Sequence, residues 1–280
     1  MPSGKRAKQL RREAVRTPPP VRSKGAPGAR QASPRVLAIA GIVVLVVVAA
    51  VLAVVFATRG SGNSGVAKDI PARGSATSKV ALPGAMDVRK LFAGIPQQGL
   101  YLGSSKAPAT LTEFIDLQCP LCQEFETQQL PTIVTKYVKT GRLLIRMEPW
   151  SILDRPGTPP DSNRGQAATI AASLQSKAFQ FAEMLYLNQG QEDSGWLTDR
   201  MIQLAAASVD QMQVQPVLSK MGSSGVQSIV KGVDQRAATA GFTATPTILL
   251  NKKGKPAKVV SVGVPDLSTL ESQIDAAVGG

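Results

Sequence analysis

The sequence predicts an α/β domain with an inserted helical region, placed behind a single N-terminal transmembrane helix. Three observations support this prediction. A strand–helix–strand pattern covers residues 110–148, and a series of helical segments follows over about 155–240. The stretch 36–58 carries no charge and is almost entirely Val, Ala, Leu and Ile. The first two patterns are typical of an open α/β sheet, and the third is typical of a membrane span.

The uncharged stretch is long enough to cross a bilayer. Its 23 residues reach roughly 34 Å at about 1.5 Å per helical residue. The apolar part of a secretory signal is shorter, so we expect an uncleaved anchor. The alternative is a long signal peptide cut near Ala57 or beyond it.

The charge distribution orients this anchor. The chain has a net charge of +13, of which about +10 lies in residues 1–59 and about +3 in residues 60–280. The positive-inside tendency then leaves the tail 1–35 in the cytoplasm and places everything after Arg59 outside, at the cell membrane. We expect the tail to be disordered and its bases to meet the lipid bilayer. The nearly neutral, aromatic-poor remainder argues against nucleic acid as a partner.

The part beyond the anchor is expected to be a flexible linker (59–84), rich in Gly, Ser, Ala and Pro, and one folded domain (85–280). The domain alternates strands and helices before and after the helical region. Up to residue 148 we expect a helix (87–92), two strands (99–102, 110–117), a helix from Pro120 to about Lys139 that Pro131 kinks and Gly141 ends, and a strand (142–148). The helical region is expected to contain a long helical stretch (163–187) and three helices (196–207, 210–221 broken by Pro216, 225–240). A hairpin (245–250, 259–264) and a helix (266–278) capped by Asp266 or Ser268 are expected to close the domain.

The only two cysteines, Cys119 and Cys122, lie between a predicted strand and a predicted helix. The chain has no histidine, so a zinc site, an iron–sulfur cluster and a Cys–His nucleophile all lack ligands or partners. We therefore expect no metal and no cofactor. A purely structural disulfide here would close a very small loop and stabilise the fold little.

A redox dithiol explains the pair better. The first thiol of a C-x-x-C motif at a helix N-terminus faces free backbone N–H groups and the positive end of the helix dipole, and both lower its pKa. Pro120 suits the first helical turn, where its missing N–H has no partner to lose. We expect Cys119 to be the exposed nucleophile and Cys122 the buried resolving thiol. An inert pair is the alternative.

Two more residues gain meaning beside a dithiol. Glu113 lies in the apolar strand, where burial raises a carboxyl pKa and would let it exchange protons with Cys122. The alternative is an acid at the strand end, turned toward water. Pro246 opens another strand, where proline marks a special backbone site. The Thr245–Pro246 bond is then either cis and beside the cysteines, or an ordinary trans bond at a sheet edge.

The runs EFIDLQCPLC (113–122) and ATPT (244–247) resemble DsbA-like thiol–disulfide oxidoreductases, most closely the membrane-anchored bacterial type. The resemblance covers about residues 85–280. It implies a thioredoxin-like fold with the helical domain inserted between the strand at 142–148 and the strand after Pro246. It also implies that Cys119 exchanges with substrate and Cys122 resolves.

The resemblance further implies that Pro246 is the cis-proline beside the dithiol and Glu113 the buried acid of the family. Thr245 is expected to tune the dithiol and, with Pro120 and Leu121, to contact substrate. The strongly oxidising members have a histidine between the cysteines, and here the dipeptide is Pro-Leu. The resemblance therefore implies the reaction class and leaves the oxidising strength open.

Three functions follow, of which we favour the first. An enzyme outside the cell membrane would pass its Cys119–Cys122 disulfide to exported cysteine-containing proteins and be reoxidised by a quinone-linked membrane partner. The second is a reductase or isomerase with the same chemistry. The third is a membrane-tethered binding module whose scaffold no longer performs redox work.

Overall fold

The structure, a computed structural model, describes residues 66–279. The basic tail and the anchor expected at 36–58 lie outside this part of the chain. Within residues 66–279, no helix combines the length and the apolar character that crossing a bilayer requires.

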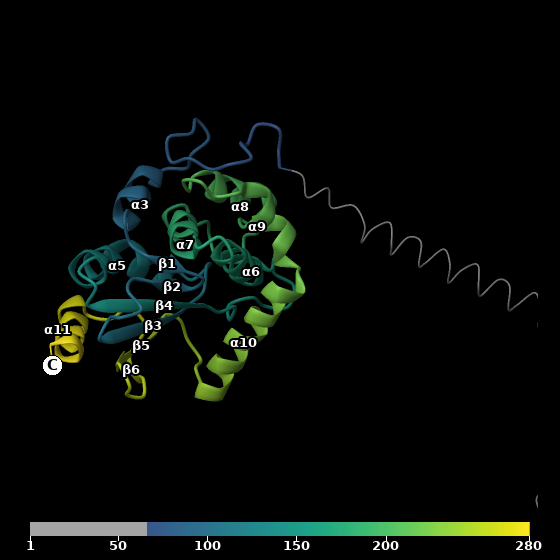
Figure 1. The fold of residues 1–280 in the computed structure, drawn as a ribbon. Coiled ribbons are helices and arrows are strands. Elements are labelled where there is room, and N and C mark those ends of the chain that lie inside the picture. Colours follow the sequence, from purple (N-terminus) through teal and green to yellow (C-terminus); the bar gives the residue numbers. More distant parts are fainter. Residues whose placement is uncertain (1–65, 280) are drawn as a thin grey trace, which may run out of the picture. The chain divides into compact units, whose positions relative to one another are not determined.

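A six-stranded mixed sheet lies at the centre of this part of the chain, with helices on both sides (Figure 1). The strand order is β1-β2-β4-β3-β5-β6, and only β3 and β4 are parallel neighbours. In chain order the strands are β1 (Gln97–Gln98), β2 (Tyr101–Leu102), β3 (Ala109–Ile115), β4 (Leu143–Pro149), β5 (Thr247–Lys252) and β6 (Lys258–Val262).

The first edge of the sheet differs from the expectation. A single strand was expected at 99–102, but β1 and β2 form a tight antiparallel hairpin with Gly99 and Leu100 at its turn. Gly99 adopts φ 57°, which glycine reaches without a steric penalty. The polar pair in β1 has no apolar alternation, so its sequence gave no strand signal.

The helix that follows β3 runs from Pro120 to Val138, and we call it the dithiol helix. It comprises α4 (Pro120–Glu124), η1 (Phe125–Gln129), α5 (Leu130–Ile133) and η2 (Val134–Val138), of which η1 and η2 are π-helical. Leu130 N–H bonds to the carbonyl of Phe125, five residues back. Pro131 has no N–H to continue an α-helical ladder, so the expected disturbance takes the form of a wider turn just before it. Gly141 follows with φ 74° near the expected end.

The helical insertion lies between β4 and β5. The stretch expected at 163–187 is in fact two helices, because the chain turns at 174–177, where Ser176 adopts φ 54°. Pro216 does not break its helix, since it falls in the first turn. The insertion comprises α6 (Asp161–Ser173), α7 (Ala178–Leu187), α8 (Asp199–Ala207), α9 (Val214–Met221) and α10 (Ser224–Ala240).

The two faces of the sheet contact different helices. Phe114 of β3 packs with Trp150 and with Val233 of α10, whereas Leu111 and Ile115 belong to the main core that contains the dithiol helix. Side chains alternate along a strand, so Glu113 points to the same face as Leu111 and Ile115. This places a carboxyl group beneath the dithiol helix.

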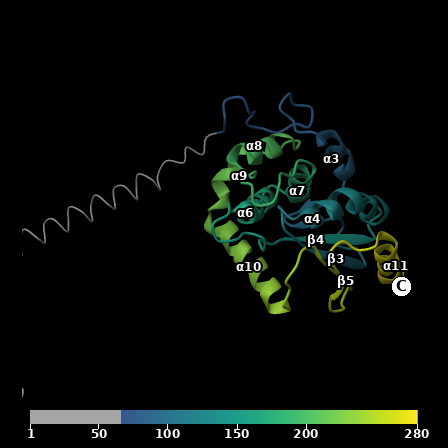
Figure 2. The ribbon, with the colours of Figure 1, turned by 180° about the vertical axis from the view of Figure 1, so that it is seen from behind.

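The last helix, α11 (Leu267–Val278), packs beside the dithiol helix. Its predicted cap is confirmed, because the Asp266 carboxylate accepts from Thr269 N–H at 2.8 Å. Lys136 Nζ reaches Glu271 Oε1 at 3.1 Å across the two helices. Figure 2, the view from behind, shows α10 and α11 at opposite sides of the sheet.

Residues 66–84 correct the expectation of a flexible linker, which is wrong for this segment. They run over α8 toward α3 (Ala85–Phe92), at the top of Figure 1. The backbone N–H groups of Ala76 and Leu82 donate to Asp210 Oδ1 and Ser208 Oγ, both at 2.8 Å. Ile70 and Ala76 are buried. The composition of this segment predicts a tether, but its backbone N–H groups find hydrogen-bond acceptors more than 120 residues away in the chain.

The contact at Asp210 yields a prediction about stability. Asp210 accepts from Ala76 N–H and pairs with Arg89 at 3.0 Å. Asp210→Ala should lower the free energy of unfolding by about 1–2 kcal/mol, because it leaves the Ala76 N–H without its acceptor. Asp210→Asn keeps an acceptor oxygen and should retain most of the stability. Urea unfolding measures both, and equal stability of Asp210→Ala and the parent would contradict the role given to residues 66–84.

Candidate functional site

The dithiol lies where the chain leaves β3 and enters the dithiol helix. Cys119 is the N-cap residue of α4, with extended backbone angles (φ −74°, ψ 121°), and Pro120 is its first helical residue. Both cysteines are free thiols. Cys122 is fully buried, as expected, and Leu121 between them is 49% exposed.

Cys119 is less accessible than the sequence suggested. Its residue surface is only 5% exposed, so the expectation of an exposed nucleophile is wrong for this state of the molecule. The segment just before β5 covers the sulfur, because Cys119 Sγ contacts the carbonyl oxygen of Thr245 at 3.5 Å. Residues 126 positions apart in the chain therefore meet at the sulfur.

The Thr245–Pro246 peptide bond is cis, which excludes the trans alternative. Thr247 of β5 lies opposite Phe114 of β3, so the two residues before it reach the end of β3 from which the cysteines emerge. Thr245 is buried. The expected meeting of the cis-proline strand with the dithiol is thus confirmed.

The surroundings lower the pKa of Cys119 to about 6. The Cys122 thiol contributes most, because it donates to the Cys119 sulfur. Burial opposes this effect, and the Thr245 hydroxyl and the backbone N–H groups of Cys122 and Leu121 support it. The free N–H groups are those of a helix N-terminus, which stabilise a thiolate as the motif predicted.

Cys122 behaves in the opposite way. Burial raises the pKa of its thiol well above the ordinary value, and the hydrogen bond to Cys119 and the charge on Cys119 add to this. At neutral pH the pair therefore holds one proton, on Cys122. The two sulfurs are unequal in charge, as an attacking thiolate and a resolving thiol must be.

Three carboxyl groups lie buried on the same side of the sheet. Glu113 comes from β3, Glu126 from η1 and Glu183 from α7. Burial and then the charge of Glu183 raise the pKa of Glu113 to about 8, and burial raises the pKa of Glu183 to about 8. Burial, followed by the charges of Glu113 and Glu183, raises the pKa of Glu126 well above its usual range.

The prediction of a buried Glu113 is confirmed, whereas the sequence reasoning missed Glu126 and Glu183. Glu126 follows Cys122 by four residues, a spacing that puts two side chains on one face of a helix, so a signal existed. Glu183 comes from the insertion, and no local pattern links it to the dithiol.

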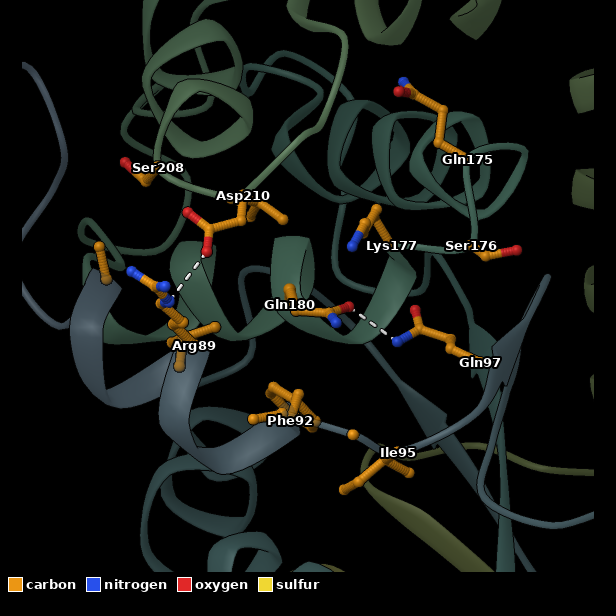
Figure 3. Close-up of a pocket in the computed structure, with 15 residues that line it drawn as sticks. Arg89, Phe92, Ile95, Gln97, Gln175, Ser176, Lys177, Gln180, Ser208 and Asp210 are labelled. Atoms are coloured by element: carbon orange, nitrogen blue, oxygen red, sulfur yellow. Dashed lines mark hydrogen bonds and ion pairs between the residues drawn. The ribbon is translucent and has the colours of Figure 1, made fainter. Parts of the chain in front are cut away.

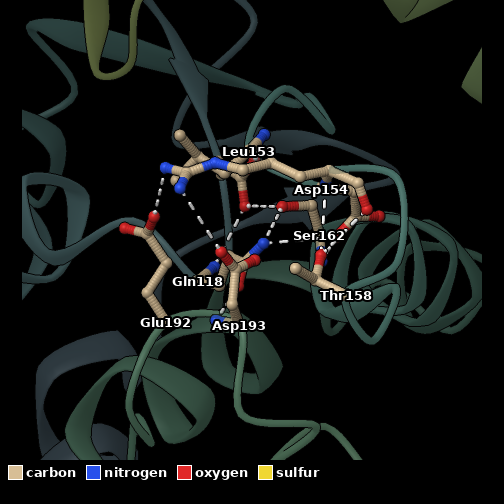
Figure 4. Close-up of polar contacts among 9 residues, drawn as sticks. Gln118, Leu153, Asp154, Thr158, Ser162, Glu192 and Asp193 are labelled. Carbon is tan, nitrogen blue, oxygen red and sulfur yellow. Dashed lines mark hydrogen bonds and ion pairs between the residues drawn. The ribbon is translucent and has the colours of Figure 1, made fainter.

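A polar network fixes the loop before Cys119 (Figure 4). The buried Gln118 donates from Nε2 to Ser162 Oγ at 2.8 Å and to Asp154 Oδ1 at 3.2 Å, and its Oε1 accepts from Asp193 N–H at 2.9 Å. Figure 4 shows these side chains converging from the loop after β4, the start of α6 and the loop after α7. Asp116 extends the network, because it accepts from Ser162 Oγ at 2.8 Å and from the N–H groups of Ile152 and Leu153.

Side chains of the insertion also bind the dithiol segment directly. Gln189 Nε2 donates to the carbonyl oxygens of Leu117 and Cys119, at 2.9 and 3.3 Å. Tyr186 Oη donates to the Asp116 carbonyl at 3.0 Å. A side chain at Gly165 of α6 would overlap Leu117, so the helix lies in close contact with this loop. The helical insertion therefore positions the dithiol.

A polar pocket of about 500 Å³ lies away from the dithiol (Figure 3). Arg89 and Asp210 form an ion pair at one side of it, and Gln97 donates to Gln180 at 2.7 Å. Neither cysteine lines it. Within residues 66–279, no group of three or more His, Cys, Asp or Glu side chains is arranged to hold a metal ion.

Comparisons with known proteins agree with this geometry. Residues 96–261, more than half of the chain, match the sequence profile of the family described as thioredoxin. A relative in Bacillus cereus, named "probable disulfide bond formation protein D", is 24% identical over 189 residues, which cover 66% of this chain and 81% of the relative. Disulfide bond formation protein D of Bacillus subtilis is 22% identical over 160 residues, 54% of this chain and 67% of that protein.

Solved structures share the fold. BdbD from Bacillus subtilis, in its oxidised form, superposes with a TM-score of 0.56 at 20% identity, over 66% of this chain and 98% of that one. A disulfide oxidoreductase (DsbG) from Mycobacterium tuberculosis, in reduced form, gives 0.51 at 24% identity, over 65% and 88%. The thioredoxin-like fold with a helical insertion is thereby established.

The acidity of Cys119 can be measured by alkylation. The rate of reaction with iodoacetamide should rise with pH around a midpoint near 6, because only the thiolate reacts and the pKa of Cys119 is lowered to about that value. Cys122→Ala removes the main hydrogen-bond donor and should move the midpoint upward. Cys122→Ser keeps a donor and should move it less. A midpoint equal to that of free cysteine would contradict the proposed stabilisation.

Glu113→Gln tests the buried carboxyl through stability. The pKa of Glu113 is raised from 4.5 to about 8 on folding, so the unfolded chain releases this proton first. The free energy of unfolding of the parent should fall relative to that of Glu113→Gln as pH rises from about 4.5 to 8, by at most about 5 kcal/mol, with no further change above pH 8. Glu124→Gln, an exposed position on α4, is the control. Urea unfolding measures the stability of both proteins. If the stability advantage of Glu113→Gln over the parent decreases with rising pH, burial does not raise the pKa of Glu113.

Proposed function

Since this chain belongs to the thioredoxin family and is a protein thiol–disulfide oxidoreductase, we propose that it donates its Cys119–Cys122 disulfide to exported proteins from the outer side of a cell membrane. The observation that carries the proposal is the unequal pair of thiols, one with a pKa of about 6 and one well above the ordinary value. An inert structural pair would need no such difference. The redox-inactive binding module is not supported for the same reason.

The exchange follows from this inequality. A substrate thiolate attacks Cys119 Sγ of the disulfide, the Cys119–Cys122 bond breaks, and Cys122 takes the electron pair and a proton. A second substrate thiolate then attacks the substrate sulfur of the mixed disulfide. The substrate leaves with a new disulfide, and Cys119 leaves as a thiolate, which its surroundings stabilise. Two electrons pass from the substrate to the enzyme.

Glu113 is the proposed proton donor and acceptor for Cys122. It lies on the sheet face beneath the dithiol helix and is fully buried. Its pKa of about 8 lies near neutral pH, where a carboxyl group gives and takes protons with similar ease.

Substrate contact is proposed at the rim of the dithiol. Pro120 and Leu121 are exposed, and Leu121 presents an apolar side chain beside Cys119. Thr245 and Pro246 form the other side, with the Thr245 carbonyl at the sulfur. An unfolded polypeptide with a cysteine in an apolar stretch fits this surface.

The location and the recycling partner are proposals from the sequence. The uncharged run 36–58 and the basic residues before it support a single-pass anchor with the catalytic domain outside. A membrane enzyme linked to quinones would then accept the electrons from the reduced pair. An oxidising compartment is where such a cycle yields net disulfide formation.

A reductase or isomerase is the second candidate, favoured by one observation. The pKa of Cys119, about 6, lies in the upper part of the range for C-x-x-C thiols, about 3.5–7.5. A less acidic thiol stabilises the reduced form less and makes the disulfide a weaker oxidant.

The reduction potential decides between the two candidates. We expect a value nearer about –120 mV than about –270 mV if the pair acts as a donor of disulfides. Equilibration of the protein with glutathione buffers, followed by alkylation, gives this value. A potential at the reducing end, together with failure to oxidise a reduced unfolded polypeptide, would overturn the direction.

Variants of the two cysteines test the proposed roles. Cys119→Ser should abolish thiol exchange, because the attacked sulfur is lost. Cys122→Ser, mixed with a disulfide-containing polypeptide, should accumulate a mixed disulfide through Cys119, visible on non-reducing gels, because the thiol that would release it is lost. Retention of exchange in Cys119→Ser would contradict the assignment.

A further inference from the structure

A groove of about 390 Å³ lies on the molecule between α3, α7 and the later part of the dithiol helix. Neither cysteine nor Pro246 lines it, so it is separate from the surface at which substrate is proposed to bind. Apolar side chains form much of it, and of the two acids in its lining, Asp87 is exposed whereas Glu183 is only 4% exposed.

Glu183 is placed between this groove and the buried acids. Among residues 66–279, its Oε2 has no hydrogen-bond partner, nor does either carboxylate oxygen of Glu113 or the Oε1 of Glu126. A buried carboxylate without a hydrogen-bond partner is costly, so such a group holds a proton more readily than an exposed one. The dithiol helix packs on α7, since Gln123 Nε2 donates to the Tyr186 carbonyl at 2.8 Å. The charge of Glu183 acts on Glu113, and the charges of Glu113 and Glu183 act on Glu126.

The cluster and the resolving thiol share the dithiol helix. Glu126 lies four residues after Cys122, on the same face of the dithiol helix. Tyr186, three residues after Glu183 on α7, is fully buried and is affected by the charges of both Cys122 and Glu126. Cys122 has no exposed surface of its own.

We propose that Glu183 is the outer member of a proton relay, Glu183–Glu126–Glu113, that connects Cys122 with water in the groove. This inference deepens the proposed function and depends on it. A polypeptide bound over Cys119, Leu121 and Thr245 covers the dithiol from its own side. The groove opens elsewhere, so protons enter and leave while substrate remains bound.

The proton balance is simple. When Cys122 leaves the disulfide as a thiolate, a cluster carboxyl donates its proton to the sulfur, and water in the groove returns one to Glu183. When Cys122 attacks Cys119 Sγ of a mixed disulfide, its proton passes to a cluster carboxylate, a Cys119–Cys122 bond forms and the partner leaves as a thiolate. The proton then leaves through Glu183.

Other charged groups face Glu183 and must be included in any pH profile. Glu113 and Glu126 face it from β3 and η1. Around the groove, α3 contributes Asp87 and Lys90, and Lys139 follows η2. The two lysines favour a carboxylate at Glu183, and the three acids oppose it.

The test uses the full-length reduced protein with a disulfide-containing polypeptide, and follows decay of the mixed disulfide by acid trapping from pH 6 to 9. Glu183→Gln should slow this resolution step by about tenfold. It should also remove or shift the change in rate that the parent shows near pH 8. Glu183→Asp keeps a carboxyl and should recover part of the rate. Glu124→Gln, an exposed acid on α4, removes the same charge and should match the parent. With dithiothreitol, a small reductant that leaves the dithiol uncovered, Glu183→Gln should slow reduction of the enzyme disulfide less.

The outcomes separate three cases. Equal rates and pH profiles for Glu183→Gln and Glu124→Gln overturn the relay. A uniform decrease in Glu183→Gln at every pH, with no rescue by Asp, also overturns it and indicates a packing role. If the parent and Glu124→Gln exchange no thiols at all, the redox function itself fails and the relay fails with it.

Discussion

The hydrogen bond from the Cys122 thiol to the Cys119 sulfur is the interaction on which the site depends. It needs Cys119 at the helix N-terminus, where free N–H groups face the sulfur, and Cys122 one turn inside, where no water competes. Burial opposes both thiolates. At Cys119 the hydrogen-bond donors outweigh this effect, whereas at Cys122 burial and the Cys119 sulfur outweigh the donors, so the two pKa values shift in opposite directions. The difference in acidity is a property of the pair, and neither cysteine has it alone.

The sheet supplies what the helix cannot. Antiparallel pairing of β5 with β3 carries the Thr245–Pro246 segment to the cysteines from 126 residues away. Because side chains alternate along β3, the same strand that leads into the dithiol also directs Glu113 under it. Strand register therefore fixes both the acid below the sulfur atoms and the backbone beside them.

The helical insertion is part of the site as well as a cover for it. Gln189, Tyr186 and Ser162 bind the backbone or side chains of residues 116–119, and α7 adds a third buried carboxyl. The comparisons agree with this architecture, since the superposition with this chain covers 98% of BdbD. Their identities near 20% mean that they define the fold, while the polar network at Gln118 and the acid at Glu183 are read from this chain itself.

The sequence by itself determined the dithiol at a strand–helix junction, the special backbone at Pro246, the burial of Glu113 and most element types, because these depend on local spacing, caps and periodicity. It did not reveal the β1–β2 hairpin, the break at Ser176 or the packing of residues 66–84. It also missed the low exposure of Cys119 and the positions of Gln118 and Glu183. The hairpin and the break at Ser176 lie in short segments whose sequence has no hydrophobic period. The other features are decided by atoms far apart in the chain, such as Ala76 with Asp210 or Cys119 with Thr245. Local patterns specify which backbone and side-chain groups need partners, and only the tertiary structure decides which distant groups meet that need.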